Sequence, residues 1–402
     1  MTDEPWEIRL HSALAVGEFH RAWFRETHQR VLDGEPFAIC NGDEIEEVLT
    51  LMGIPVLIMN NWNYEIIAQG GQAHYTELLH ERGYTGPQMF ALGYASALDP
   101  AAAPWGGLPR PSVIVTGGKS EMELRVCELW AKHFDCPLFA MDFMFSVPFD
   151  APKDNWWKTI RDDWPELIDP ARLALRVEQE TQFIRVMEQQ TGRTFSPADL
   201  IAAMNLINEQ MDLWHEAQAL IAAAPKSPAS IRDQMQIYQA MWHRGTPHAV
   251  EMIRRYRDEI AERVASGVAA HPGEKIRLYY NGRVPPWHEE IARRYGAVTV
   301  CASYTGIPDL YARNMHDGDP LPAMASRHVF LFAQGPERII DVARDHRCDG
   351  VIVIEPKLDP AYPSAERIAI ERAGLPYLAV PRDSADHEVV AMVSRFIEQR
   401  LS

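Results

Sequence analysis

The run PSVIVTGGKSEMELR, residues 111–125, places a lysine and a hydroxyl directly after an apolar, β-branched stretch. Its segment Gly118-Lys119-Ser120 matches the end of a P-loop, G-x-x-x-x-G-K-[ST]. The first glycine of that motif would fall at Val113, inside the predicted strand, so the loop is too short to wrap phosphates. The sequence therefore argues against ATP binding. It leaves a lysine and a hydroxyl at a helix N-terminus, where free N–H groups attract anions.

Polar residues also follow the other predicted strands. In parallel α/β sheets, ligands bind beyond the carboxyl ends of the strands. Each such residue alone reads as an ordinary solvated turn residue, but together they favour a site in a cleft between two α/β domains. Lys119, Glu355 and Asp359 are the candidates for catalysis, in acid–base and oxyanion roles. The candidates for substrate binding are Asn60, Asn61, Ser120, Ser303, Tyr304 and Lys357.

Alternating strands and helices must position these residues. We predict strands at 55–59, 112–116 and 138–141, and later at KIRLYYNG, AVTVCASYT, DGVIVIEP and LPYLAV. Helical runs separate most of them, which is the pattern of parallel βαβ units. After AVTVCASYT we expect a long irregular loop.

The middle of the chain has long helical periodicity, with Ser196 and Pro197 as a helix start and breaks that divide it into three or four helices. The stretch 349–383 repeats the element order of 111–143, which indicates an internal repeat. We therefore predict an N-terminal helical segment at 1–36, a first α/β domain at 37–154, a helical region at 155–274 and a second α/β domain at 275–402.

The composition excludes several classes of protein. The net charge of −17 argues against nucleic-acid binding, which needs a basic surface. No apolar run is long enough to span a membrane, and no secretory signal is visible at the start. The five cysteines are scattered and form no metal-binding spacing, which fits a reducing cytoplasm.

The run GAVTVCASYTGIPDLYARNMHDGDPLPAMA, residues 296–325, resembles the benzoyl-CoA-reductase-type branch of the 2-hydroxyacyl-CoA dehydratase and benzoyl-CoA reductase subunit family. In that branch a strand ending in Ser-Tyr-Thr precedes a loop with His-Asp and Asp-Pro-Leu. RLYYNG before it, and DGVIVIEP and GLPYLAVPRD after it, also fit, so the resemblance covers roughly 37 to 395. It implies two flavodoxin-like α/β domains, pairing with a related subunit, and a coenzyme A thioester as substrate, with an aromatic or branched acyl group as in anaerobic aromatic degradation.

The chain departs from this family at the iron–sulfur ligands. Members hold a 4Fe–4S cluster through cysteines, and the corresponding places here are Met89, Gly118 to Ser120, the stretch 326–332 and Asp359. None is a cysteine, and iron–sulfur clusters need thiolates. We therefore expect no cluster in this chain, any cluster to lie in a partner subunit, and the five cysteines to be small buried apolar residues.

Three functions remain open. The chain can be a cluster-free subunit of an acyl-CoA-processing complex of the dehydratase, hydratase or reductase type. It can instead be a redox-independent acyl-CoA hydratase or lyase that acts by acid–base chemistry. The third alternative is a non-catalytic assembly or binding subunit. We expect the chain to assemble with a related subunit as a heterodimer, or with itself as a homodimer.

Overall fold

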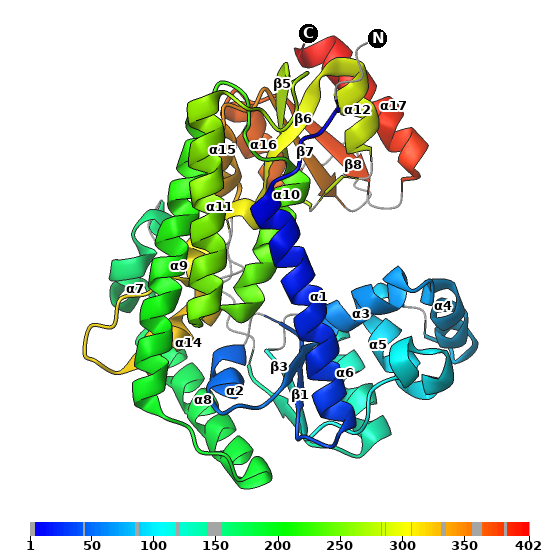
Figure 1. Ribbon diagram of the computed structural model, residues 1–402, viewed down its shortest axis with the longest axis vertical. Helices are drawn as coiled ribbons and strands as arrows, with labels where there is room; N and C mark the ends of the chain where they lie inside the picture. The colour runs from blue at the N-terminus through cyan, green and yellow to red at the C-terminus, as the bar shows by residue number, and fades with distance from the viewer. Residues whose placement is uncertain are drawn as a thin grey trace.

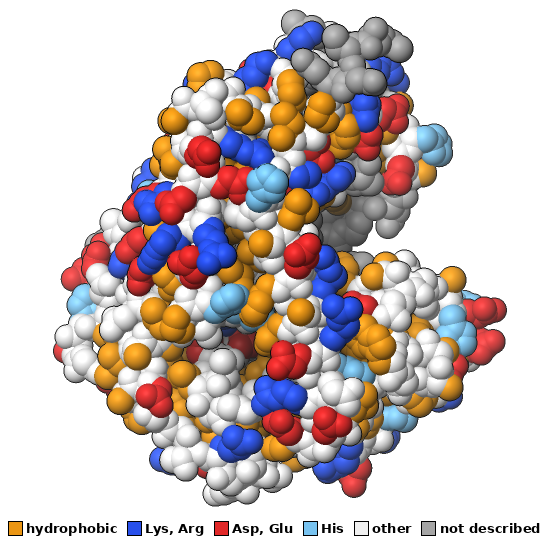
Figure 2. Space-filling view, in the orientation of Figure 1, with side chains coloured by type: hydrophobic (Ala, Val, Ile, Leu, Met, Phe, Trp, Pro, Cys, Tyr) orange, Lys and Arg blue, Asp and Glu red, His pale blue; other side chains and the backbone are white. Residues whose placement is uncertain are grey.

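The computed structural model describes residues 5–42, 45–84, 88–117, 121–142, 155–282, 284–285, 287–306, 308–330, 335–355, 364–381 and 384–401. Two α/β units lie at opposite ends of the long axis, and a wall of long helices joins them on one side (Figure 1). On the other side the surface is hollowed between the two units (Figure 2). None of the described helices combines the length and the apolar character that crossing a membrane would require.

Sheet A, in the first unit, has four parallel strands in the order β2-β1-β3-β4. They are β1 Ala38–Cys40, β2 Val56–Ile58, β3 Val113–Thr116 and β4 Leu138–Ala140. Alternate residues of β1 face different cores: Ala38 and Cys40 face one, and Ile39 faces the other. Because both faces are covered, the inner strands are continuous apolar runs.

Sheet B, in the second unit, has four parallel strands in the order β6-β5-β7-β8. They are β5 Ile276–Tyr280, β6 Ala297–Ala302, β7 Gly350–Glu355 and β8 Tyr377–Pro381. The order repeats that of sheet A strand for strand, and it is the order of the first four strands in flavodoxin-like sheets. The predicted fold class, two flavodoxin-like parallel-sheet domains, is confirmed.

The helices of the first unit are α2 Glu46–Leu51, α3 Met59–Ala68, α4 Gln72–Glu81, α5 Gln88–Leu98 and α6 Glu121–Phe134, with the 3-10 turns η1 Pro100–Ala102 and η2 Pro104–Gly106. Most of them cover one face of sheet A, whereas α2 packs on the other face, where its Val48 and Leu49 join the core of the helical region. Trp62 of α3 and Trp130 of α6 pack in the same core as Ile39 and Ile114 of the sheet. The other face of sheet A is covered by the helical region, whose Phe183 and Met204 share a core with Val113.

The helical region contains five α-helices between residues 155 and 274, one or two more than predicted. They are α7 Ile160–Leu167, α8 Pro170–Thr191, α9 Pro197–Ala223, α10 Ile231–Ile237 and α11 Pro247–Ser266, with the 3-10 segments η4 Trp156–Lys158 and η5 Tyr238–His243. The predicted start at Ser196 is confirmed, since its hydroxyl accepts a hydrogen bond of 3.2 Å from the Asp199 N–H. Pro170 and Pro247 begin α8 and α11 in the same way.

The second unit contains helix in the region where we predicted an irregular loop. Its helical elements are α12 His288–Tyr295, α13 Ser303–Gly306, η6 Pro308–Tyr311, α14 Pro320–Phe330, α15 Pro336–Asp345, α16 Ala365–Arg372, α17 Asp386–Phe396 and the π-helical η7 Ile397–Leu401. The prediction is wrong because α14 packs mainly on α8 and α9, two helices that lie far from it in the sequence. Long-range contacts of this kind leave little local signal.

Helix α1, His11–Leu32, runs from the helical region to the first unit (Figure 1). Its first N–H groups, at His11 and Ser12, donate to Glu259 of α11 at 2.9 and 2.8 Å, so a distant carboxylate caps the helix. Its later residues Phe24 and Val31 pack into the core of sheet A.

Candidate functional site

The amides predicted after the strand at 55–59 lie at the carboxyl edge of sheet A. β2 ends at Ile58 and α3 begins at Met59, so Asn60 and Asn61 stand in the first helical turn. The prediction of a turn is wrong, because the strand passes directly into a helix. Asn61 is buried, whereas Asn60 is partly exposed.

Asn41 is a further amide at this edge, and the sequence analysis missed it. It directly follows β1, the strand next to β2, and it is 1% exposed. Among the residues that the structure describes, neither side-chain polar atom of Asn41 or of Asn61 has a hydrogen-bond partner. The rule that polar residues after parallel strands form sites would have found Asn41, had the short run 38–40 been assigned as a strand.

At the carboxyl edge of sheet B, Ser303 and Asn281 are joined. The Ser303 hydroxyl donates to the Asn281 carbonyl oxygen at 2.9 Å. The Asn281 side chain in turn accepts from the Ile354 N–H at 2.7 Å. The ends of β6, β5 and β7 are thereby connected, and Ser303 lies in the single helical turn α13.

Glu355, a predicted catalytic residue at the end of β7, is partly exposed and already hydrogen-bonded. Its carboxylate accepts from the Ser364 hydroxyl at 2.6 Å and from the Tyr377 hydroxyl. Burial and the neighbouring Glu355 raise the pKa of Tyr377, and they also raise the pKa of Glu366. Glu355 thus ties the start of α16 to β8.

Tyr304, a predicted substrate-binding residue, packs in a core. Its ring meets that of Tyr238 edge-on, with centroids 5.5 Å apart. The remaining predicted site residues, Lys119, Ser120, Lys357 and Asp359, lie outside the described residues.

A buried ionic cluster lies beyond the carboxyl end of β1, at the start of α2. Glu47 accepts from Arg244 at 2.5 Å and lies 2.8 Å from the Arg327 guanidinium, and Arg244 also reaches Glu46 at 2.9 Å. All four side chains are at most 5% exposed. Burial raises the pKa of Glu47, but Arg244 and Arg327 outweigh burial and lower it to about 2.

Two more arginines extend this cluster towards α8. Arg176 donates to Glu180 at 3.0 Å, and Arg313 donates to the Ser326 hydroxyl at 2.8 Å. Burial, partly offset by Arg176, raises the pKa of Glu180 to about 7. The pKa of Arg313 is lowered by burial and by Arg327. The cluster joins the first unit, the helical region and α14, and sequence reasoning missed it because its members are remote in the chain.

A pocket of about 430 Å³, here called the α1–α3 pocket, lies at the carboxyl edge of sheet A, beside Asn61. Its wall includes Arg21 and Arg25 of α1, Asn61 and Tyr64 of α3, Trp105 and Trp242. Its wall therefore includes Asn61, whose amide has no hydrogen-bond partner among the described residues.

His20, on the wall of the α1–α3 pocket, forms a pair with His243. The His20 Nδ1 and His243 Nε2 atoms are 3.1 Å apart. Burial, together with Arg21, lowers the pKa of His20 to about 4, and burial together with His20 lowers that of His243 to about 3. Both imidazoles are therefore neutral near pH 7.

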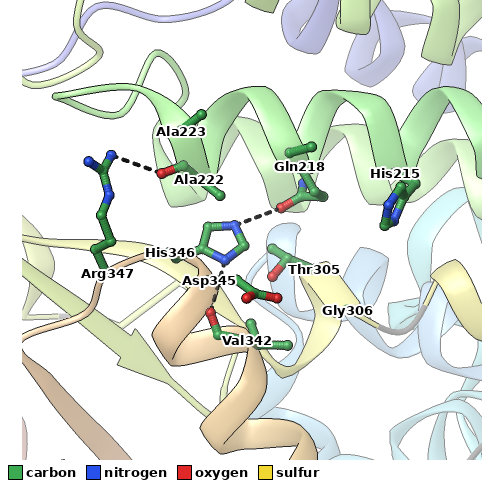
Figure 3. A pocket seen from close by; sticks show the side chains of 11 residues that line it. His215, Gln218, Ala222, Ala223, Thr305, Gly306, Val342, Asp345, His346 and Arg347 are labelled. Atoms are coloured by element: carbon green, nitrogen blue, oxygen red, sulfur yellow. Dashed lines mark hydrogen bonds between the residues drawn. The ribbon is translucent and has the colours of Figure 1, made fainter. Parts of the chain in front are cut away.

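A second pocket, of about 530 Å³, lies between α9, α13 and α15 (Figure 3). Its polar groups bind each other: His346 contacts Gln218 at 3.3 Å and the Val342 carbonyl oxygen at 3.0 Å. Arg347 donates to the Ala222 carbonyl oxygen at 2.8 Å. These contacts fasten α15 to α9, and neither strand-end amide of sheet A lines the pocket. The α1–α3 pocket is the better candidate site despite its smaller volume.

The cysteines do not fit a 4Fe–4S cluster, which needs several convergent thiolates. Cys40 and Cys127 lie in different cores, and Cys301 and Cys348 lie in a third, with their sulfurs 3.5 Å apart. Burial raises the pKa of Cys301, which opposes formation of the thiolate. Within the described part of the chain, no group of three or more His, Cys, Asp or Glu side chains could hold a metal ion. The prediction that these four cysteines are buried apolar residues is confirmed; Cys136 is half-buried.

Comparison with known proteins identifies the family. The model of the family described as 2-hydroxyglutaryl-CoA dehydratase, D-component, matches residues 90–399. This range includes β3 and β4 of sheet A, the helical region and sheet B. No curated protein matches the chain. Since the match covers well over half of the chain, this protein belongs to the 2-hydroxyglutaryl-CoA dehydratase D-component family.

Proposed function

We propose that the chain is a cluster-free subunit of an acyl-CoA-processing complex, and that it holds a coenzyme A thioester at the carboxyl edge of its sheets. The family description names a component of a dehydratase that acts on a CoA thioester, which supports this substrate class. The cysteine positions support the absence of a cluster, because they do not converge. We further propose an aromatic or branched acyl group, a related partner subunit that carries any 4Fe–4S cluster, and a cytoplasmic location.

The observation that carries the proposal is the pair of amides at Asn41 and Asn61. An enclosed polar group without a hydrogen-bond partner costs about 1–3 kcal/mol. Two of them at the ends of adjacent strands, among the described residues, would be an expensive arrangement in a purely structural protein. Amides can donate to a thioester carbonyl oxygen and accept from a pantetheine amide, so a CoA thioester would satisfy both kinds of atom.

The proposed catalytic roles of Lys119, Glu355 and Asp359 remain predictions. Glu355 already accepts hydrogen bonds from Ser364 and Tyr377, which favours a positioning role over free acid–base chemistry. These two hydrogen bonds favour the subunit function over a hydratase or lyase whose acid–base chemistry depends on Glu355 alone.

The test replaces Asn61 by leucine, which has nearly the same shape but cannot hydrogen-bond. The Asn61→Leu variant should be as stable as the wild type or more stable, because no partner in the described structure is lost. Its affinity for benzoyl-CoA or a 2-hydroxyacyl-CoA, measured by calorimetry, should fall about tenfold or more, the loss expected when a hydrogen bond in a closed site is removed.

Asn208 supplies the matched control. It is also buried, but its amide donates to the Arg313 carbonyl oxygen and accepts from the Arg313 N–H, both at 2.9 Å. Asn208→Leu should therefore lose stability by about 1–3 kcal/mol while its folded fraction still binds acyl-CoA. Unchanged acyl-CoA affinity in Asn61→Leu, or no acyl-CoA binding by the wild type, would refute the proposed function.

A further inference from the structure

The α1–α3 pocket combines two arginines with exposed aromatic rings. We propose that it binds the adenine nucleotide end of the coenzyme A ester, with phosphate groups on Arg21 and Arg25 and the base on Trp105. This inference rests on the proposed function and adds to it a second contact region for the same ligand. It assigns the residues that recognise the nucleotide, as distinct from the amides that face the thioester.

Arg21 and Arg25 are one helical turn apart on α1, so their side chains lie on the same face. Both are exposed, and among the described residues neither has a hydrogen-bond or salt-bridge partner. Figure 2 shows basic side chains along the middle of α1, on the side facing α3. Arginines bind phosphates through charge-assisted, often paired hydrogen bonds. On a chain with a net charge of −17, two arginines at a pocket that have no partner in the described part of the chain mark a local anion site.

Trp105 offers a flat surface for a base. One side of its ring packs against His28 and Phe24, with centroids 5.2 and 6.0 Å away, while 41% of the residue stays exposed. Its backbone has φ +50°, a left-handed conformation that is unfavourable for a bulky residue. His28 contacts the Gly107 carbonyl oxygen at 3.0 Å and so holds the turn in place. A fixed and half-exposed indole is suited to stacking on adenine.

The other charges at the pocket do not oppose a phosphate strongly. His20 is neutral near pH 7 and adds no positive charge. The carboxylate of Glu65 accepts from the Gln69 amide at 2.7 Å, so it is engaged within its own helix. Two arginines therefore outnumber one carboxylate at the pocket.

The pocket also has a suitable size and position. Its volume of about 430 Å³ lies in the usual range for small-molecule sites. Asn61 forms part of its wall and directly follows β2. A ligand whose nucleotide lies against Arg21 and Arg25 would thus extend its pantetheine arm towards the carboxyl edge of sheet A.

The experiment compares coenzyme A, 3′-dephospho-coenzyme A and adenosine 3′,5′-bisphosphate, measured by calorimetry on the full chain. Arg21→Ala and Arg25→Ala should each weaken coenzyme A and the bisphosphate by about tenfold, the expected loss of a charge-assisted hydrogen bond to phosphate. The wild type should bind the dephospho form less tightly than coenzyme A, and this difference should shrink in the variants. Trp105→Leu should weaken all three adenine-containing ligands.

Arg185→Ala is the matched control. Arg185 is an exposed arginine of α8 that does not line the pocket, and its removal changes the net charge equally. Its affinities should equal those of the wild type. If the Arg21 and Arg25 variants bind acyl-CoA like the wild type, the inference is wrong while the proposed function stands. If the bisphosphate binds through these arginines but no acyl-CoA binds, the pocket is a nucleotide site but not one for a coenzyme A ester, and the proposed function fails. If nothing binds, both are wrong.

Discussion

In the ionic cluster at the start of α2, the charge of the Glu47 carboxylate should contribute strongly to the free energy of unfolding. The arginines hold the pKa of Glu47 at about 2 instead of 4.5. The difference of about 2.5 corresponds to about 3 kcal/mol of stabilisation at neutral pH. Removing one member of a buried ion pair typically costs about 3–5 kcal/mol, which agrees in size. Glu47→Gln should therefore lower the free energy of unfolding by about 3 kcal/mol at pH 7.

The pH dependence gives the sharper test. Because the folded pKa is depressed, the stabilisation is complete above pH 4.5 and is lost as the pH falls towards 2. The gap between wild type and Glu47→Gln should thus narrow from about 3 kcal/mol at pH 7 to about 1 kcal/mol at pH 3. Urea denaturation followed by circular dichroism at both pH values would measure the gap.

Glu35→Gln is the control, since the Glu35–Arg30 pair is solvent-exposed, at 2.8 Å, and its loss should change little. A Glu47→Gln variant as stable as the wild type at pH 7, or a gap that is the same at pH 3, would refute the assignment of Glu47 as an ionised, buried partner of Arg244 and Arg327.

Two further predictions concern Glu180 and iron. The raised pKa of Glu180, about 7, means that its ionisation costs stability as the pH rises from 4.5 through 7. Glu180→Gln should therefore match the wild type at pH 4 and exceed its free energy of unfolding by about 3 kcal/mol at pH 8 or above, and equal stability at both pH values would contradict this. The chain purified without oxygen should contain no stoichiometric iron or acid-labile sulfide, because its cysteines lie in separate cores, and one cluster per chain would disprove it.

The fold was largely predictable because parallel sheets leave a strong local signal. Runs such as VIVT of β3 and GVIVIE of β7 are apolar on both faces, and the residues that follow them in the sequence are clearly more polar than the strands. Helix α14 was not predictable in this way. Its sequence, PLPAMASRHVF, has prolines as its first and third residues, and it packs on α8 and α9, whose residues are far away in the chain.

The candidate site was predictable only in part. Asn61 and Ser303 follow strands, so the rule for parallel sheets located them at the correct edges. The ionic cluster was beyond such a rule, because Glu47 and Arg244 are 197 residues apart and a single glutamate on a predicted helix resembles a solvated one. Only the folded chain shows that the two charges are enclosed together.

The capping of α1 by α11 has a consequence for synthesis on the ribosome. Ser12 hydrogen-bonds to Glu259, which is 247 residues later in the chain. At a translation rate of about 5–20 residues per second, Ser12 is synthesised roughly 12–50 s before Glu259, whose carboxylate caps the first turn of α1. During that time its apolar side chains, such as Val16, lack part of their final packing surface. The nascent chain should therefore expose an amphipathic helix to chaperones until α11 emerges, and newly made chains truncated before residue 259 should be more sensitive to protease within α1 than the complete protein.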